Sequence, residues 1–192
     1  MSATVARTVL AVSTCLTLCL MAGCSAEAPV APGPARNLER YGAPTVPRSL
    51  DVTAQATDPC QSLLSVAELS DLGFDARGSA RSYLGVQECS WTADDGQSLS
   101  LAADRDRDLL ADAYRVRGRG VFIPIDVAGF PAVVEKTGRG ELNSCSLTTG
   151  LGPRQALTAQ WFGKEPLGSN PDACELAKQA STLAIRKLPP AS

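Results

Sequence analysis

Residues 88–102 read ECSWTADDGQSLSLA, and they indicate the architecture of the domain more clearly than any other segment. Apolar and polar residues alternate on both sides of the central Asp94-Asp95-Gly96 turn. An Asp-Gly pair between two alternating segments is a strong signal for a β-hairpin, because the glycine adopts the positive φ that tight hairpin turns require. We therefore expect residues 88–92 and 98–102 to form an antiparallel pair.

Three more strands are predicted towards the C-terminus, at Pro131–Lys136, Ser144–Thr149 and Ala156–Phe162. Short glycine-containing segments join them, and such short connections favour antiparallel pairing of consecutive strands. Together with the hairpin, these segments predict one antiparallel sheet of about five strands.

Helices are expected before, between and after these strands. Asp58-Pro59-Cys60 and Pro171-Asp172-Ala173-Cys174 each precede apolar residues at three- and four-residue spacing, and Asp and Pro are typical of helix starts. A polar helix is also predicted over Asp106–Arg117. The resulting order, αββαβββα, predicts an α+β domain in which helices pack on the sheet, and an all-β sandwich is the alternative.

The first 23 residues have the pattern of a signal peptide. Arg7 supplies a positive charge, and the apolar stretch Val9–Ala22 is too short to span a bilayer, which needs roughly 20 residues. The stretch ends in Leu20-Met21-Ala22-Gly23-Cys24, which is similar to a bacterial lipoprotein signal. We expect residues 1–23 to be removed and Cys24 to be acylated, which would anchor the protein in membrane lipid. An ordinary signal peptide with an incidental cysteine is the alternative.

The chain after Cys24 is expected to divide into a tether and one domain. Residues 24–57 contain five prolines and few large apolar residues, so we predict a disordered tether. Residues 58–190 have their own start and stop signals and the size of a single domain.

The seven cysteines are expected to have three different fates. Two of them fall in the signal and Cys24 is lipidated, so Cys60, Cys89, Cys145 and Cys174 remain. Four spaced cysteines in an exported chain predict two disulfides, for which three pairings are possible. We favour Cys60 with Cys89 and Cys145 with Cys174, because each pair would then join a terminal helix to a strand.

Several short motifs in the chain point to one family. They are a signal ending at Cys24, a Pro/Ala-rich tether, Asp58-Pro59-Cys60, Cys89-Ser90-Trp91, Val127-Ala128-Gly129-Phe130-Pro131-Ala132, a strand cysteine at Cys145, and a final Cys-led helix closing on Leu188-Pro189. In this combination the chain resembles the actinobacterial lipoproteins grouped as domain of unknown function 3558. The resemblance implies an envelope lipoprotein, and it carries over no catalytic residue.

The composition argues against several classes of function. The chain has no histidine, which excludes the Ser-His-Asp and Cys-His catalytic arrangements and histidine-ligated zinc. No nucleophile, phosphate-binding or dinucleotide-binding motif occurs, so we predict no catalytic residue, no metal site and no cofactor. The net charge of −2 gives no reason to expect nucleic acid as a partner.

Two charged clusters and two tryptophans remain as candidates for function. Asp94 with Asp95, and the acidic residues at positions 104, 106 and 108, could serve as catalytic carboxylates, and the group at 104–108 could also bind calcium. A turn explains the first pair better, and a solvated helix start explains the second group better. Arg115, Arg117 and Arg119 form the one basic cluster and could bind an anion, whereas cations that complement a helix C-terminus are the structural alternative. Trp91 and Trp161 are expected in the core.

These observations predict a non-enzymatic envelope lipoprotein on the extracytoplasmic face of the cell membrane. Its domain is expected to bind an envelope protein or a small-molecule or lipid ligand. The alternative is an enzyme or enzyme regulator that acts on a cell-wall or lipid substrate through Asp, Glu and Arg residues.

Overall fold

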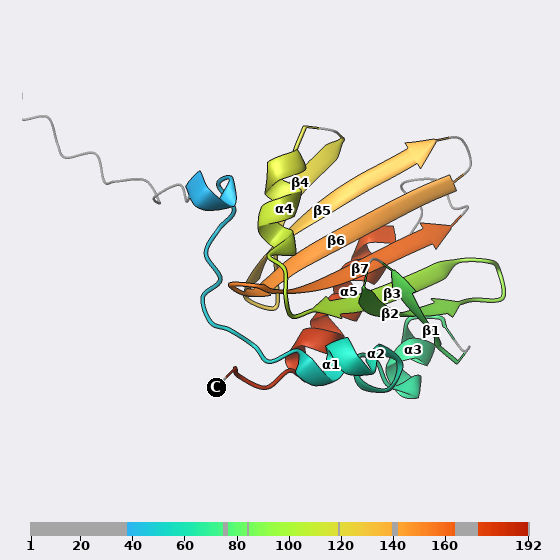
Figure 1. The fold of residues 1–192 in the computed structure, drawn as a ribbon. Helices are drawn as coiled ribbons and strands as arrows, with labels where there is room; N and C mark the ends of the chain where they lie inside the picture. The colour runs from blue at the N-terminus through green and yellow to red at the C-terminus, as the bar shows by residue number, and fades with distance from the viewer. Residues whose placement is uncertain are drawn as a thin grey trace, which may run out of the picture. The chain divides into compact units, whose positions relative to one another are not determined.

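The computed structural model describes residues 38–74, 77–83, 85–118, 120–139, 142–163 and 173–191. The predicted signal peptide and Cys24 lie outside these residues. The described residues form a seven-stranded antiparallel sheet in the order β1-β2-β3-β7-β6-β5-β4 (Figure 1). The strands are β1 (Ser79–Tyr83), β2 (Val86–Thr92), β3 (Ser98–Asp104), β4 (Val121–Val127), β5 (Phe130–Arg139), β6 (Leu142–Gly152) and β7 (Gln155–Gly163).

Helices flank the strands at both ends of the chain and between β3 and β4. They are the 3₁₀ turn η1 (Leu38–Arg40) and the helices α1 (Thr53–Thr57), α2 (Pro59–Ser62), α3 (Val66–Asp71), α4 (Leu109–Val116) and α5 (Ala173–Arg186). The predicted fold class is therefore wrong: the described chain contains seven strands instead of five, and its order is αααβββαββββα instead of αββαβββα.

The two strands that the prediction missed are the two edges of the sheet. All five residues of β1 are exposed, so this strand lacks the apolar alternation by which strands are recognised. β4 carries Pro124 in its middle, and proline within an apolar run argues against a central strand but is tolerated at an edge. The predicted hairpin is confirmed, since β2 pairs with β3 with Trp91 opposite Leu99.

The helical segment predicted after Asp58-Pro59-Cys60 is divided into two short helices. Asp58 caps α2 by accepting a hydrogen bond from the backbone N–H of Gln61. Ser65 then begins α3 with a capping box, in which its side chain and that of Glu68 each satisfy the other residue's backbone N–H. This Ser-x-x-Glu pattern marks a second helix start inside the apolar repeat, and it explains the interruption.

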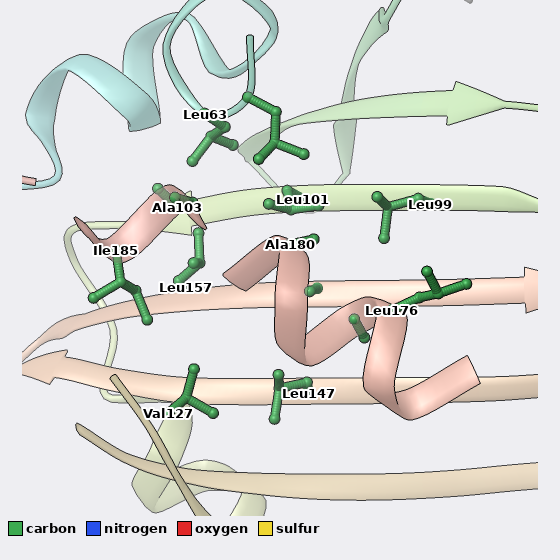
Figure 2. Close-up of a cluster of buried hydrophobic side chains, with 14 of the residues drawn as sticks. Leu63, Leu99, Leu101, Ala103, Val127, Leu147, Leu157, Leu176, Ala180 and Ile185 are labelled. Carbon is green, nitrogen blue, oxygen red and sulfur yellow. The ribbon is translucent and has the colours of Figure 1, made fainter. Parts of the chain in front are cut away.

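The main core lies between one face of the sheet and the helices α1, α2, α3 and α5. Figure 2 shows Leu176, Ala180 and Ile185 of α5 above the leucines of the central strands. Cys89 and Cys145 point to this same face, because they belong to neighbouring cross-strand rows that include Leu101 and Trp161. The α5 helix follows the sheet closely because alanines line its buried side at 177, 180 and 184.

The opposite face of the sheet carries α4 at one end (Figure 1). Gly150 of β6 makes this packing possible, since a Cβ there would lie 2.8 Å from Leu110 Cδ2. Leu110 and Tyr114 of α4 bury themselves in a small second cluster with Ala43 and Val133.

The predicted tether is too long, because its second half belongs to the domain. Leu50 and Val52 are buried, and the backbone N–H of Leu50 donates to the carbonyl of Leu151 at 2.9 Å. Leu50 also forms an isolated bridge with Pro190, so the entry and exit of the domain lie side by side. Further upstream, the Arg40 guanidinium donates twice to Asp108, at 2.6 and 3.0 Å. The proline content of this segment favours disorder, but the buried side chains of Leu50 and Val52 pack it against the domain.

Candidate functional site

Two disulfides join helices to the sheet, with the pairing expected from the sequence. Cys60 of α2 is bonded to Cys89 of β2 with a Cα–Cα distance of 5.0 Å. Cys145 of β6 is bonded to Cys174 of α5 with a Cα–Cα distance of 5.3 Å. Each bond closes a loop of sequence separation 29, which in the chain-entropy model stabilises the fold by about 3–4 kcal/mol.

The acidic cluster between β3 and α4 has structural partners. Asp104 is buried and accepts hydrogen bonds from the backbone N–H groups of Asp106 and Arg107 and from the Arg107 guanidinium at 2.6 Å. Asp108 caps α4 and holds Arg40, while Asp106 is largely exposed. Asp104 and Asp106 both line a pocket of about 350 Å³, whereas Asp108 is not among its described lining residues. Asp104 and Asp108 are occupied by hydrogen bonds within the β3–α4 connection.

The second acidic pair is part of the β2–β3 turn. Asp95 accepts hydrogen bonds from the backbone and the side-chain amide of Gln97, and the turn closes with Gly96 N–H donating to Ala93. The described residues hold no cluster of His, Cys, Asp and Glu that could ligate a metal ion.

The arginines predicted as an anion site have separate neighbours. Arg115 forms an ion pair with Asp112 at 3.2 Å on the exposed side of α4. The Arg117 guanidinium lies over the Tyr114 ring, 6.0 Å from its centroid. Arg119 lies outside the described residues. Anion binding at this cluster stays a prediction.

Both tryptophans are buried in the core, as predicted. Trp91 is 1 % exposed and Trp161 is 2 % exposed, and the Trp161 indole N–H donates to Gln97 Oε1 at 3.1 Å. Leu99 lies between the two rings in one cross-strand row.

A pocket of about 590 Å³ opens beside the Cys60–Cys89 disulfide, between α2, α3 and the start of β1. We call it the α2–α3 pocket. It is lined by Cys60, Gln61, Leu64, Ser65, Val66, Leu69, Phe74, Arg77, Gly78 and Trp91. Its volume is within the range of small-molecule sites in proteins.

Local sequence shapes this pocket at the end of α3. Gly73 has a φ of +85°, which ends the helix in the left-handed conformation, and the following N–H of Phe74 donates back to Leu69 at 2.8 Å. This turn places the Phe74 ring in the apolar wall. Further along, Gly78 passes directly over the disulfide and Trp91, since a Cβ at Gly78 would lie 2.2 Å from Cys89 Sγ.

The pocket lining is apolar with one charge. Among its described residues only Arg77 is ionic, and this side chain is exposed. Val66 is 81 % exposed at the first position of α3, so an apolar side chain faces water at the rim of the pocket. Sequence reasoning missed this site because its residues come from three separate segments, and the Gly73-Phe74 helix end was its one local signal.

An ion pair fixes α3 next to the pocket. Burial acts to raise the pKa of Glu68, but hydrogen bonds from the Lys187 ammonium at 2.5 Å and from Ser65 outweigh it and hold the pKa below its ordinary value. Elsewhere, on the α4 side of the sheet, burial raises the pKa of Glu135.

Comparisons with known proteins place the chain in a family without naming an activity. No curated protein and no solved structure matches it. In the part of the chain that the structure describes, no helix is long and apolar enough to cross a membrane. One family model matches residues 19–187, from the predicted signal to the end of the last helix. The chain therefore belongs to the family described as protein of unknown function, DUF3558.

Proposed function

We propose that this chain is a cell-envelope lipoprotein of the actinobacterial kind that its motifs resemble. In this proposal residues 1–23 are a cleaved signal, and acylated Cys24 anchors the protein to the outer face of the cytoplasmic membrane. The domain that follows is a non-enzymatic module that binds an envelope ligand or partner.

The main support for the proposed location outside the cytoplasm is the pair of disulfides. Both bonds join a helix to the sheet across a buried core, so they are structural bonds of the folded state. Structural disulfides form and persist in oxidising compartments and are rare in the cytosol. This agrees with the export signal that ends at Cys24.

The proposed absence of catalysis is supported by the hydrogen bonds that Asp104 and Asp108 accept from other groups of the protein. An enzyme acting through carboxylates needs them to converge on substrate with perturbed pKa values. Here Asp104 and Asp108 instead hold Arg107, Arg40 and the start of α4. The described residues that line the α2–α3 pocket include no carboxylate, which suits a binding site better than a hydrolytic one.

Replacement of Cys24 tests the lipid anchor. The Cys24→Ala chain should leave the membrane fraction and lose metabolic labelling with palmitate, because no other site in this proposal is acylated. Ser25→Ala is the matched control and should stay membrane-bound and labelled. If the Cys24→Ala chain keeps its label and its membrane association, the anchoring proposal is wrong.

A further inference from the structure

We propose that the α2–α3 pocket binds an amphipathic anion, with the apolar part of the ligand against the pocket wall and its carboxylate or phosphate group on Arg77. This inference rests on the proposed function, since it names the ligand class of the proposed binding module.

The apolar part of the ligand is inferred from the pocket wall. Leu64, Leu69 and Phe74 form the wall on the core side, and the exposed Val66 extends it to the rim. An occupant that covers Val66 removes apolar surface from water, which favours an alkyl chain over a polar ligand. Cys60 of the disulfide and Gly78 complete the described lining with uncharged groups.

The anionic group is inferred from the charge of the rim. Arg77 is the one charged side chain among the described lining residues, since Gln61 and Ser65 are polar but neutral. Among the described residues none forms an ion pair with Arg77, and its side chain is exposed where it lines the pocket. Arginine binds carboxylate and phosphate groups through two parallel hydrogen bonds, whereas a cationic ligand would be repelled.

Another pocket of the described structure differs from the α2–α3 pocket in the charges that line it. It has a volume of about 340 Å³, lies between α3 and α5, and carries Asp71, Glu175, Lys178 and Arg186. Lys178 and Glu175 lie 3.7 Å apart there, so charges of both signs meet and favour no ligand charge. The α2–α3 pocket is the one of the two with a single sign of charge next to an apolar wall.

Calorimetric titration with dodecanoate, below its critical micelle concentration, tests the proposal. The protein is the full chain carrying Cys24→Ala, which has no acyl chains of its own at that position. Dodecyltrimethylammonium has the same chain with the opposite charge, and butyrate has the anion with a short chain. We expect dodecanoate to bind at least about tenfold more tightly than either.

Variants locate the binding to the pocket. Arg77→Gln should weaken dodecanoate binding about tenfold or more, and Arg77→Lys should restore part of it. Val66→Ser should weaken it a few-fold, because the alkyl chain then loses apolar contact. Arg105→Gln is the matched control and should leave binding unchanged, since Arg105 is exposed in the β3–α4 connection and does not line the pocket.

A second experiment, with vesicles, distinguishes a phospholipid from a free acid as the source of the anionic group. Sedimentation with phosphatidylglycerol vesicles, compared with phosphatidylcholine vesicles, shows whether Arg77 engages a phospholipid headgroup, while dodecanoate alone shows a free acid. Binding of either kind that depends on Arg77 supports the proposal. Absence of both, equal binding by Arg77→Gln, or equal binding of the cationic amphiphile overturns it. None of these outcomes alters membrane release by Cys24→Ala, so the two proposals fail independently.

Discussion

Ala128 has a φ of +54°, in the left-handed region that residues with a Cβ rarely adopt. Together with Gly129, at +83°, it forms the two-residue turn between β4 and β5, where both central residues of a type I′ turn need positive φ. We expect Ala128→Gly to raise the free energy of unfolding by about 0.5–1 kcal/mol, the relief of strain less the added entropy of the unfolded chain. Urea denaturation measures this, and an unchanged or lower stability would contradict it.

At Gly78 the backbone packs directly against the Cys60–Cys89 disulfide and Trp91, and a substitution there tests this close packing. A Cβ there would lie 2.2 Å from Cys89 Sγ and 2.6 Å from Trp91 Nε1, so the neighbours must move. Gly78→Ala should therefore destabilise the fold by about 1–3 kcal/mol. Gly120→Ala is the control, because its nearest neighbour would be 3.9 Å away, and its effect should stay within about 0.5 kcal/mol. Equal effects in thermal unfolding would count against the packing described.

At the scale of elements, α3 is held to the end of α5 by the Glu68–Lys187 ion pair, which makes part of the stability depend on pH. The folded pKa of Glu68 lies below its ordinary value of 4.5, so the ionised carboxylate stabilises the fold above about pH 4.5. That contribution is lost as the pH falls through the folded pKa. Glu68→Gln should lower stability by about 0.5–1 kcal/mol at pH 7 and by less at pH 3. A difference between the two proteins that is the same at both pH values would refute the linkage.

The β4 edge carries its own protection against pairing. Val127 and Phe130 flank the two-residue turn as a hydrogen-bonded pair, and the alternation of antiparallel pairs then makes Pro124 and Val133 a non-hydrogen-bonded pair. The nitrogen of Pro124 therefore faces away from β5, towards the open edge, where it offers no N–H to another strand. Val121 and Ile123 are 50 % and 43 % exposed next to it, which makes this protection necessary.

Removal of the proline should expose this edge. Pro124→Val should increase self-association over the parent protein in analytical ultracentrifugation, because an apolar edge strand with an outward N–H pairs readily. Pro124→Lys restores the same N–H but adds a charge, and should associate less than Pro124→Val. Equal sedimentation of all three proteins would show that Pro124 has no protective role.

At the scale of the whole molecule, patterns with a local cause were predicted well. The β2–β3 hairpin follows from its Asp-Gly turn, and the four cysteines pair as the positions of the helices and strands suggested. The predictions fail where contacts between distant segments of the chain determine the structure. β1 lies at the edge of the sheet and all its residues are exposed, so it has no apolar face to recognise. Leu50 and Val52 follow a proline-rich segment but are buried in the core. The α2–α3 pocket was missed for the same reason, since Arg77 and Trp91 come to line one pocket only in the folded chain.

In our proposal this disulfide-bonded domain is exported and held at the membrane by an acyl group on Cys24. Intact-mass measurement of the protein extracted from membranes of its native host, with alkylation before reduction, tests both the anchor and the disulfides in one experiment. We expect a chain that begins at Cys24, carries at least a diacylglycerol, and has no alkylated thiol at Cys60, Cys89, Cys145 or Cys174. A chain that retains residues 1–23 without acylation, or one with four alkylated thiols, would contradict it.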